Sequence, residues 1–220
     1  MPETQEVRPK LYTLGEEIMN SVTHGVGALL SVAAMVIMIV CAAKYSTALS
    51  VISSAVFGAT LVILYTSSTL YHAFTNSNVK SLFQIFDHCT IFLLIAGTYT
   101  PLTLVAIGGK LGWTVFAVIW AAAILGIILN AISIKRFAKL SMVLYLAMGW
   151  AAVVTFGSLI DALGQGGIIF LVSGGLAYTV GVIFYALNKK CRFMHSIWHL
   201  FVLAGSVLHF FCILLYVILP

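Results

Sequence analysis

Two histidines four residues apart, His195 and His199, carry the clearest chemical signal in the sequence. On an α-helix the two imidazoles would stand side by side on one face, close enough to share a metal ion. A third imidazole, His72, lies near the end of another apolar run. Three protein nitrogens with one open position are typical of a catalytic zinc (Zn²⁺) site. Hydrogen bonding between helices is the alternative interpretation of such a histidine pair.

Two further side chains are candidate catalytic residues at such a site. Asp87 could hold and deprotonate a water on the metal, or orient a ligand histidine. It could also be an ordinary carboxylate near a helix start, where the helix dipole favours it. Ser68 precedes His72 by one helical turn, so its hydroxyl could steady a water or polarise a substrate carbonyl.

These polar residues stand out because the rest of the chain is so apolar. Of its 220 residues, 62% are hydrophobic and 8% are charged. Soluble domains are about 45–50% apolar and about 25% charged. This composition excludes a cytosolic globular enzyme, a disordered protein and a disulfide-rich secreted domain. The four cysteines are far apart and form no disulfide or metal pattern.

Seven apolar runs are long enough to cross a bilayer as helices, which takes about 20 residues each. They cover roughly residues 19–43, 47–74, 82–107, 111–134, 139–160, 166–187 and 195–218. Strands of a membrane barrel would alternate polar and apolar residues, and these runs do not. We therefore predict an all-α integral membrane protein, a seven-helix bundle. It would have a polar cytoplasmic segment at 1–18 and a single membrane domain at 19–220.

Basic residues predict the orientation of this bundle. With seven spans, nine of the 11 lysines and arginines fall on the side of the N-terminus. The positive-inside rule then predicts a cytoplasmic N-terminus and an outside C-terminus. The net charge of +5 is explained by these loops, so no nucleic-acid partner is expected.

Polar side chains gather at the cytoplasmic ends of the predicted helices. Five of the six histidines lie there, together with Asp87. Ionisable groups inside a membrane are costly, so such a cluster is a candidate functional site. Residues that could contact the metal ligands or a substrate, or form only a polar or packed helix interface, are Glu17, Asn20, His24, Tyr71 and His88. His209 lies about 15 Å further along the last helix than His199, so it cannot reach the same ion.

Five segments of the chain form a recognisable set of motifs: EEIMNSVTHG at 16–25, STLYH at 68–72, FDH at 86–88, AGTYTP at 96–101 and HSIWH at 195–199. Together they closely resemble the bacterial hemolysin III family. They occur in the family's order, and the resemblance covers essentially the whole chain. The family belongs with the progestin and adipoQ receptors and, more distantly, with the alkaline ceramidases.

The resemblance implies seven transmembrane helices with the N-terminus inside and zinc held by His72, His195 and His199. Asp87 would lie near the metal water, and Ser68 is the serine of the shared pattern. Members of the wider group look like lipid amide hydrolases that act on ceramide-like substrates. The implied protein is a zinc-dependent lipid hydrolase or lipid-homeostasis factor of the bacterial cytoplasmic (inner) membrane, with membrane lipids as surroundings and substrate.

Two other functions stay open at this point. One is a non-enzymatic regulator or receptor of membrane state, in which zinc is only structural. The other is a pore-forming cytolysin. We disfavour the cytolysin because a secreted toxin must be soluble before it inserts, and this composition is not soluble without a carrier.

Overall fold

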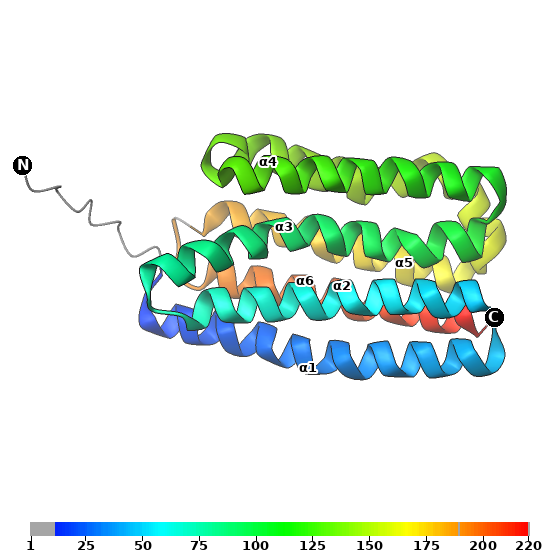
Figure 1. The fold of residues 1–220 in the computed structure, drawn as a ribbon, viewed down its shortest axis with the longest axis horizontal. Helices are drawn as coiled ribbons and strands as arrows, with labels where there is room; N and C mark the ends of the chain where they lie inside the picture. Colours follow the sequence, from blue (N-terminus) through cyan, green and yellow to red (C-terminus); the bar gives the residue numbers. More distant parts are fainter. Residues whose placement is uncertain (1–11, 189, 220) are drawn as a thin grey trace, which may run out of the picture.

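The computed structural model describes residues 12–188 and 190–219, and all regular structure in these ranges is helical (Figure 1). In chain order the elements are α1 (Leu14–Tyr45), α2 (Ala48–Ala73), α3 (Ser77–Pro101), a π-helical turn η1 (Leu102–Ile107), α4 (Gly109–Trp150), a 3-10 turn η2 (Ala151–Thr155), α5 (Phe156–Leu187), α6 (Met194–Ile213) and a π-helical turn η3 (Leu214–Ile218). The prediction of an all-α protein is therefore confirmed.

The outside of the helix bundle is apolar along much of its length. Leu29 on α1 is 75% exposed, and Val154 in η2 is 87% exposed. Many other large apolar side chains of α1, α4 and α5 also face outward. Such a surface would be costly in water and is at no disadvantage among lipid chains. The chain is accordingly an integral membrane protein, as its composition predicts.

Among the described residues, five helical segments are long and apolar enough to cross a membrane, against seven runs expected from the sequence. The difference arises in residues 109–187, where helical structure continues from α4 through η2 into α5. Within it, Ser133 (φ −168°, ψ 106°) and Gly164 (φ 60°, ψ −178°) leave helical geometry. Each of these residues is a kink between two helices that follow one another without a loop, so the whole stretch counts as one segment. Figure 1 shows the ribbon of this segment turning back on itself.

Helix α1 starts before the first expected apolar run, which covers residues 19–43. Helix α1 begins at Leu14 because Thr13 and Glu16 form a capping box. The Glu16 carboxylate accepts the Thr13 backbone N–H at 2.8 Å, and the Thr13 hydroxyl accepts the Glu16 N–H at 3.4 Å. Residues 1–11 of the expected polar segment lie outside the described residues.

Four helix ends meet at one end of the bundle, the left end of Figure 1. Helix α1 packs along α2 and also contacts α6. This packing brings together the starts of α1, α3 and α6 and the end of α2 (Figure 1). Asn76 begins α3 soon after α2 ends, because its side-chain oxygen accepts the backbone N–H groups of Asn78 and Val79. Four of the six histidines, His24, His72, His195 and His199, lie near this junction with the carboxylates of Glu16 and Glu17.

Candidate metal centre

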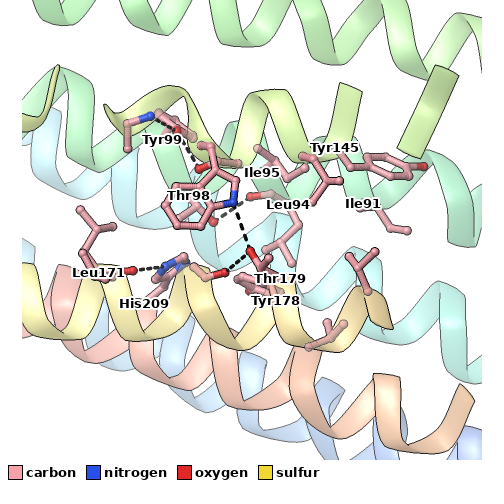
Figure 2. A pocket seen from close by; sticks show the side chains of 18 of the residues that line it. Ile91, Leu94, Ile95, Thr98, Tyr99, Tyr145, Leu171, Tyr178, Thr179 and His209 are labelled. Carbon is pink, nitrogen blue, oxygen red and sulfur yellow. Dashed lines mark hydrogen bonds between the residues drawn. The ribbon is translucent and has the colours of Figure 1, made fainter. Parts of the chain in front are cut away.

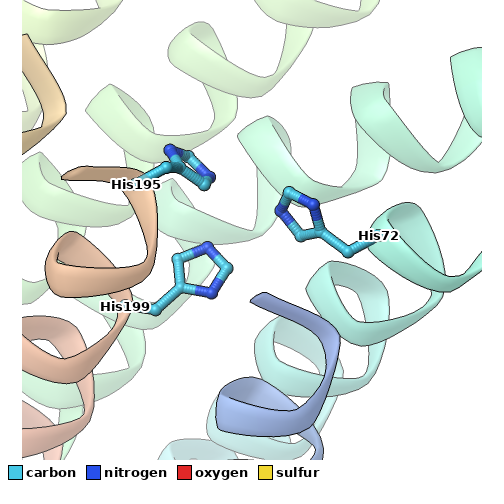
Figure 3. Close-up of side chains that lie close together, drawn as sticks. All are labelled: His72, His195 and His199. Atoms are coloured by element: carbon cyan, nitrogen blue, oxygen red, sulfur yellow. The ribbon is translucent and has the colours of Figure 1, made fainter. Parts of the chain in front are cut away.

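Three buried histidines converge where α2 ends and α6 begins (Figure 3). Each of His72, His195 and His199 offers a ring nitrogen, and these nitrogens all lie within 4.8 Å of one another. The ring centroids are 5.2 Å apart for His72 and His195, 5.1 Å for His72 and His199, and 4.6 Å for His195 and His199. We call these residues the histidine group.

The helix geometry explains how the histidine group forms. His195 and His199 lie one turn apart in the first two turns of α6, so both rings project from the same face. His72 lies in the last turn of α2, at the same end of the bundle. All three side chains are buried. Histidines taken so far out of solvent need partners, because an unpaired buried polar group costs about 1–3 kcal/mol.

On two of these three rings, one nitrogen has a hydrogen-bond partner. His72 Nδ1 lies 2.6 Å from a carboxylate oxygen of Glu17, and His199 Nδ1 lies 3.2 Å from the backbone oxygen of Asn20. Both contacts require the Nδ1 proton, so each Nε2 is left with a lone pair. Within the described residues, His72 Nε2 and both His195 nitrogens have no hydrogen-bond partner. Unpartnered imidazole nitrogens that converge in a buried site fit a metal ion.

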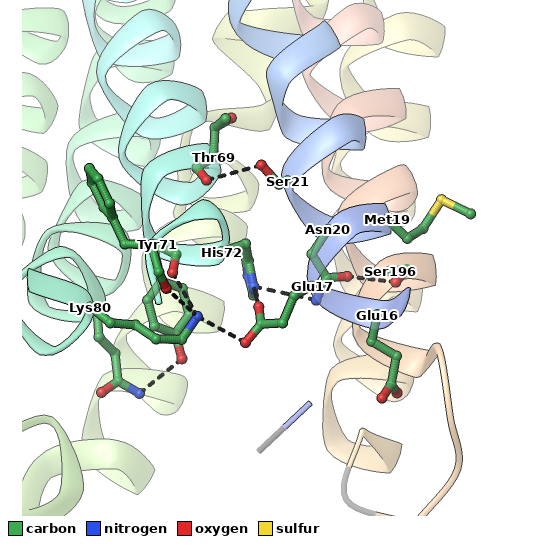
Figure 4. Close-up of polar contacts among 12 residues, drawn as sticks. Glu16, Glu17, Met19, Asn20, Ser21, Thr69, Tyr71, His72, Lys80 and Ser196 are labelled. Carbon is green, nitrogen blue, oxygen red and sulfur yellow. Dashed lines mark hydrogen bonds and ion pairs between the residues drawn. The ribbon is translucent and has the colours of Figure 1, made fainter. Parts of the chain in front are cut away.

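Glu17 is held in place by a lysine that the sequence analysis did not single out. Lys80 Nζ lies 2.9 Å from the other Glu17 oxygen and also donates to the backbone oxygens of Tyr71 and Phe74 (Figure 4). Its ammonium therefore pairs with α1 while it caps the last carbonyls of α2. A carboxylate that orients a ligand histidine is a common feature of metal sites. Glu17 has this position, which the sequence analysis had offered to Asp87.

Asn20 joins the two sides of the histidine group. Its side chain is fully buried. Its amide nitrogen lies 3.5 Å from His72 Nδ1, and its amide oxygen accepts the Ser196 hydroxyl at 2.5 Å (Figure 4). Its backbone oxygen is the partner of His199. One residue of α1 thus contacts the histidine-bearing ends of both α2 and α6.

His24 lies one turn further along α1 than Asn20 and faces the same site. Its ring stacks on the ring of His199, with centroids 3.6 Å apart and planes 7° apart. It also meets Tyr65 edge to face at 4.9 Å. His24 is not a member of the histidine group, and neither of its nitrogens has a partner in the described part of the chain.

The two candidate catalytic residues occupy different environments. Ser68 is fully buried one turn before His72, and its hydroxyl has no partner among the described residues. Asp87 is half-buried on α3 and lies outside the group of close ligand atoms. It is nevertheless close enough to Tyr12 to contribute, behind burial and two tyrosines, to the raised pKa of the Tyr12 hydroxyl.

Tyr71 and His88 are the last two residues that the sequence predicts as possible neighbours of the metal ligands or a substrate. The Tyr71 ring lies 4.6 Å from the His72 ring, with Lys80 Nζ 4.9 Å from its centroid. His88 is half-buried beside Asp87. Its backbone oxygen accepts the Tyr145 hydroxyl at 2.7 Å, which ties α3 to α4. The structure thus places Tyr71 against the histidine group and shows a backbone role for His88.

The start of α6 is fixed by a second contact that the sequence analysis missed. The Glu16 carboxylate accepts the backbone N–H of Phe193 at 2.9 Å. Phe193 has φ 60°, and no other described non-glycine residue has a positive φ. This conformation costs roughly 1–2 kcal/mol in a residue with a Cβ. Because Phe193 directly precedes α6, the contact sets the position from which His195 projects.

An apolar cavity of about 170 Å³ lies deeper in the bundle (Figure 2). Its lining includes residues of α3, α5 and α6, among them Ile91, Leu94, Leu171, Tyr178, Trp198 and His209. His209 is outside the histidine group, and its Nε2 donates to the Leu171 oxygen at 3.1 Å. Trp198 links the two regions through Tyr185, whose ring centroid lies 5.6 Å from that of Trp198 and 6.0 Å from that of His195.

Fold and site together define a helical membrane protein with a buried three-histidine group at one end of its bundle. Residues 12–210 match the family described as Haemolysin-III related, and the chain belongs to that family. Hemolysin-3 of Bacillus cereus is 47% identical over 203 residues, which cover 92% of each chain. The resemblance to hemolysin III predicted from the sequence is therefore confirmed.

Two further relatives extend the comparison. The Hemolysin-3 homolog of Bacillus subtilis is 44% identical over 206 residues, covering 94% of this chain and 96% of that protein. The Monocyte to macrophage differentiation factor of Homo sapiens is 30% identical over 169 residues, covering 74% of this chain and 69% of that protein.

Proposed function

We propose that the chain is a zinc-dependent hydrolase of lipid amides in the bacterial cytoplasmic membrane. The observation that carries this proposal is the histidine group, with three convergent nitrogens in a buried site. Surrounding lipids would be both solvent and substrate. Each further part of the proposal has its own support.

The proposed topology has seven spans, a cytoplasmic N-terminus and an outside C-terminus. Non-helical backbone at Ser133 and Gly164 supports it, because both lie at or near breaks between apolar runs. Dividing residues 109–187 at these two points leaves three segments in place of one. The predominance of basic residues in the loops of one side supports the orientation. The histidine group would then lie near the cytoplasmic face.

The proposed metal is zinc, with His72, His195 and His199 as ligands. Imidazole nitrogens suit zinc, and catalytic zinc commonly has three protein ligands and an open position. Zinc in such a site would supply Lewis-acid chemistry, polarising a carbonyl and lowering the pKa of water. Glu17 would hold His72, and the Asn20 backbone would hold His199, each by fixing the Nδ1 proton.

Asp87 and Ser68 would carry the remaining chemistry. Asp87 is the proposed general base, because it is a carboxylate on α3 that stays partly accessible. Ser68 has a buried hydroxyl without a partner in the described residues, which could donate to a substrate carbonyl. His24, also without partners there, could receive another polar group of the substrate.

The proposed substrate class rests on the cavity and on the family resemblance. The cavity lining is dominated by apolar side chains, so it suits a hydrocarbon chain rather than a polar metabolite. The Tyr185 ring packs against Trp198, in the wall of the cavity, and against His195, a proposed zinc ligand. A chain in this cavity could therefore present an amide near the histidine group.

A hydrolysis assay with a fluorescent short-chain ceramide tests the catalytic proposal. Zinc-loaded wild-type protein is compared with Asp87→Asn and with Asp161→Asn, an exposed carboxylate used as the matched control. We expect Asp87→Asn to keep its zinc and lose about 10²- to 10⁴-fold in rate. Loss of the same size in Asp161→Asn would contradict the assignment. Zinc without turnover in the wild type would leave the metal as a structural link between α2 and α6.

A further inference from the structure

Tyr12 covers the histidine group from the segment that precedes α1. Its ring centroid lies 5.0 Å from that of His195 and 5.7 Å from that of His72. These two rings belong to different helices, so Tyr12 lies across the gap between α2 and α6. Aromatic pairs at such separations are in contact.

The placement of Tyr12 contrasts with that of its neighbours. Thr13 caps α1, and Leu14, the first helical residue, is 76% exposed. Tyr12 instead turns inward, and burial raises the pKa of its hydroxyl above the ordinary value, as do the nearby Tyr71, Tyr185, Asp87 and Glu17. The hydroxyl stays neutral at physiological pH. An inward tyrosine beside an outward leucine indicates a ring placed by the site and not by general apolar packing.

Tyr185 approaches the histidine group from another side. Its ring centroid lies 6.0 Å from that of His195, while Tyr71 packs against His72. Phenol rings from α2 and α5 therefore line two sides of the histidine group. Tyr12 differs from Tyr71 and Tyr185 because it belongs to no helix. It is the described residue of this cluster that can move without displacing a helix.

We propose that Tyr12 is a specificity-determining residue that closes the water-facing side of the histidine group and excludes water-soluble molecules from it. The effect of this exclusion on hydrolysis rests on the proposed function, because it matters only if the histidine group holds zinc. A polar metabolite would have to displace the ring. A lipid could approach between the apolar helices and would not meet Tyr12 first.

The closure itself is testable on metal-free protein with diethyl pyrocarbonate, a small reagent that modifies accessible imidazoles. Mass spectrometry gives the modification rate at His195 and, as internal reference, at His209 on the same helix. We expect Tyr12→Ala to accelerate modification of His195 about tenfold, the size that loss of two ring contacts suggests. Tyr12→Phe keeps the ring and should behave as wild type.

Two results would overturn the closure. One is an unchanged His195 rate in Tyr12→Ala. The other is an equal acceleration in Leu14→Ala, the matched variant at the exposed neighbour, or at His209, because either would indicate general loosening of the bundle. Neither result depends on whether the wild type binds zinc.

A second measurement links the closure to the metal. In zinc-loaded protein, we expect EDTA to remove zinc about tenfold faster from Tyr12→Ala than from wild type or Tyr12→Phe. Failure of the wild type to bind zinc contradicts the proposed function and leaves the diethyl pyrocarbonate result intact. Equal removal rates from well-loaded proteins contradict the closure alone.

Discussion

The Glu17 carboxylate lies 2.6 Å from Nδ1 of His72, so α1 holds a proposed zinc ligand that belongs to α2. The same carboxylate pairs with Lys80 of α3 at 2.9 Å. Three helices thus meet through one carboxylate. The lysine neutralises its charge, which lowers the cost of burying the carboxylate. His72, a proposed zinc ligand, is positioned by neighbours that are distant in sequence.

Replacing Glu17 by Gln should weaken zinc binding without abolishing it. The variant loses a charged acceptor for the His72 proton, and comparable losses lower metal affinity about 10- to 100-fold. Competition with a chelator of known affinity measures the change. Asp161→Asn, which removes an exposed carboxylate far along the chain, should leave the affinity unchanged. An unaltered affinity in Glu17→Gln would show that the contact does not support the site.

Lys80→Met should act on zinc through Glu17. Alone it should weaken zinc binding less than Glu17→Gln does, because the carboxylate remains. In the double variant, the effects of Lys80→Met and Glu17→Gln should be less than additive, since the lysine acts on the metal site through the carboxylate. The test is a double-mutant cycle on zinc affinity. Strictly additive losses would mean that Lys80 acts independently, for example only by capping α2.

Glu16→Ala should destabilise the protein more than Thr13→Ala. Both variants lose the capping box, worth about 0.5–2 kcal/mol, but only Glu16→Ala also leaves the Phe193 N–H without its acceptor. The second loss adds about 1–3 kcal/mol. Thermal unfolding in a fixed detergent compares the two. Equal destabilisation would show that the contact to Phe193 contributes nothing.

Ser68→Ala should separate activity from stability. The Ser68 hydroxyl is buried and has no hydrogen-bond partner among the described residues. Its removal therefore breaks no hydrogen bond there and should leave the stability of the protein unchanged or slightly higher. Loss of a carbonyl-polarising donor lowers rates by about 10²- to 10³-fold. Ceramide hydrolysis and thermal unfolding are measured on the same sample. A stable variant with full activity would exclude the proposed role.

Zinc removal should destabilise the wild type and leave the ligand variants unaffected. A ligand that binds only the folded state stabilises it by about 2.7 kcal/mol at a free concentration of 100 times its Kd. EDTA should therefore lower the Tm of the wild type. His199→Ala should show no such shift, whereas His209→Ala should respond as the wild type does. A shift of equal size in His199→Ala would indicate that zinc acts elsewhere.

The convergence of the histidine group could be predicted because it depends on local rules. The four-residue spacing of His195 and His199 fixes a shared helix face, and the alternation of apolar runs places His72 at the same end of the bundle. The contacts of Glu17 with Lys80 and of Glu16 with Phe193 could not be predicted. They join residues far apart in sequence, and several carboxylates were available at the same depth.

Other differences come from the backbone. One apolar run is expected to end at residue 134, and the structure has a kink between two helices at Ser133, whose hydroxyl accepts the backbone N–H of Arg136 at 3.2 Å. Charge marks where a chain leaves the membrane, whereas hydrogen bonding decides where a helix ends. The early start of α1 at Leu14 has a local cause in the pairing of Thr13 with Glu16, a signal present in the sequence.

The metal content of the purified protein tests the central claim most directly. Elemental analysis of the wild type should give one zinc per chain, His72→Ala and His199→Ala should lose it, and the buried control His209→Ala should retain it. Wild-type protein that remains free of zinc after incubation with the ion would contradict the account. So would zinc that persists in both ligand variants.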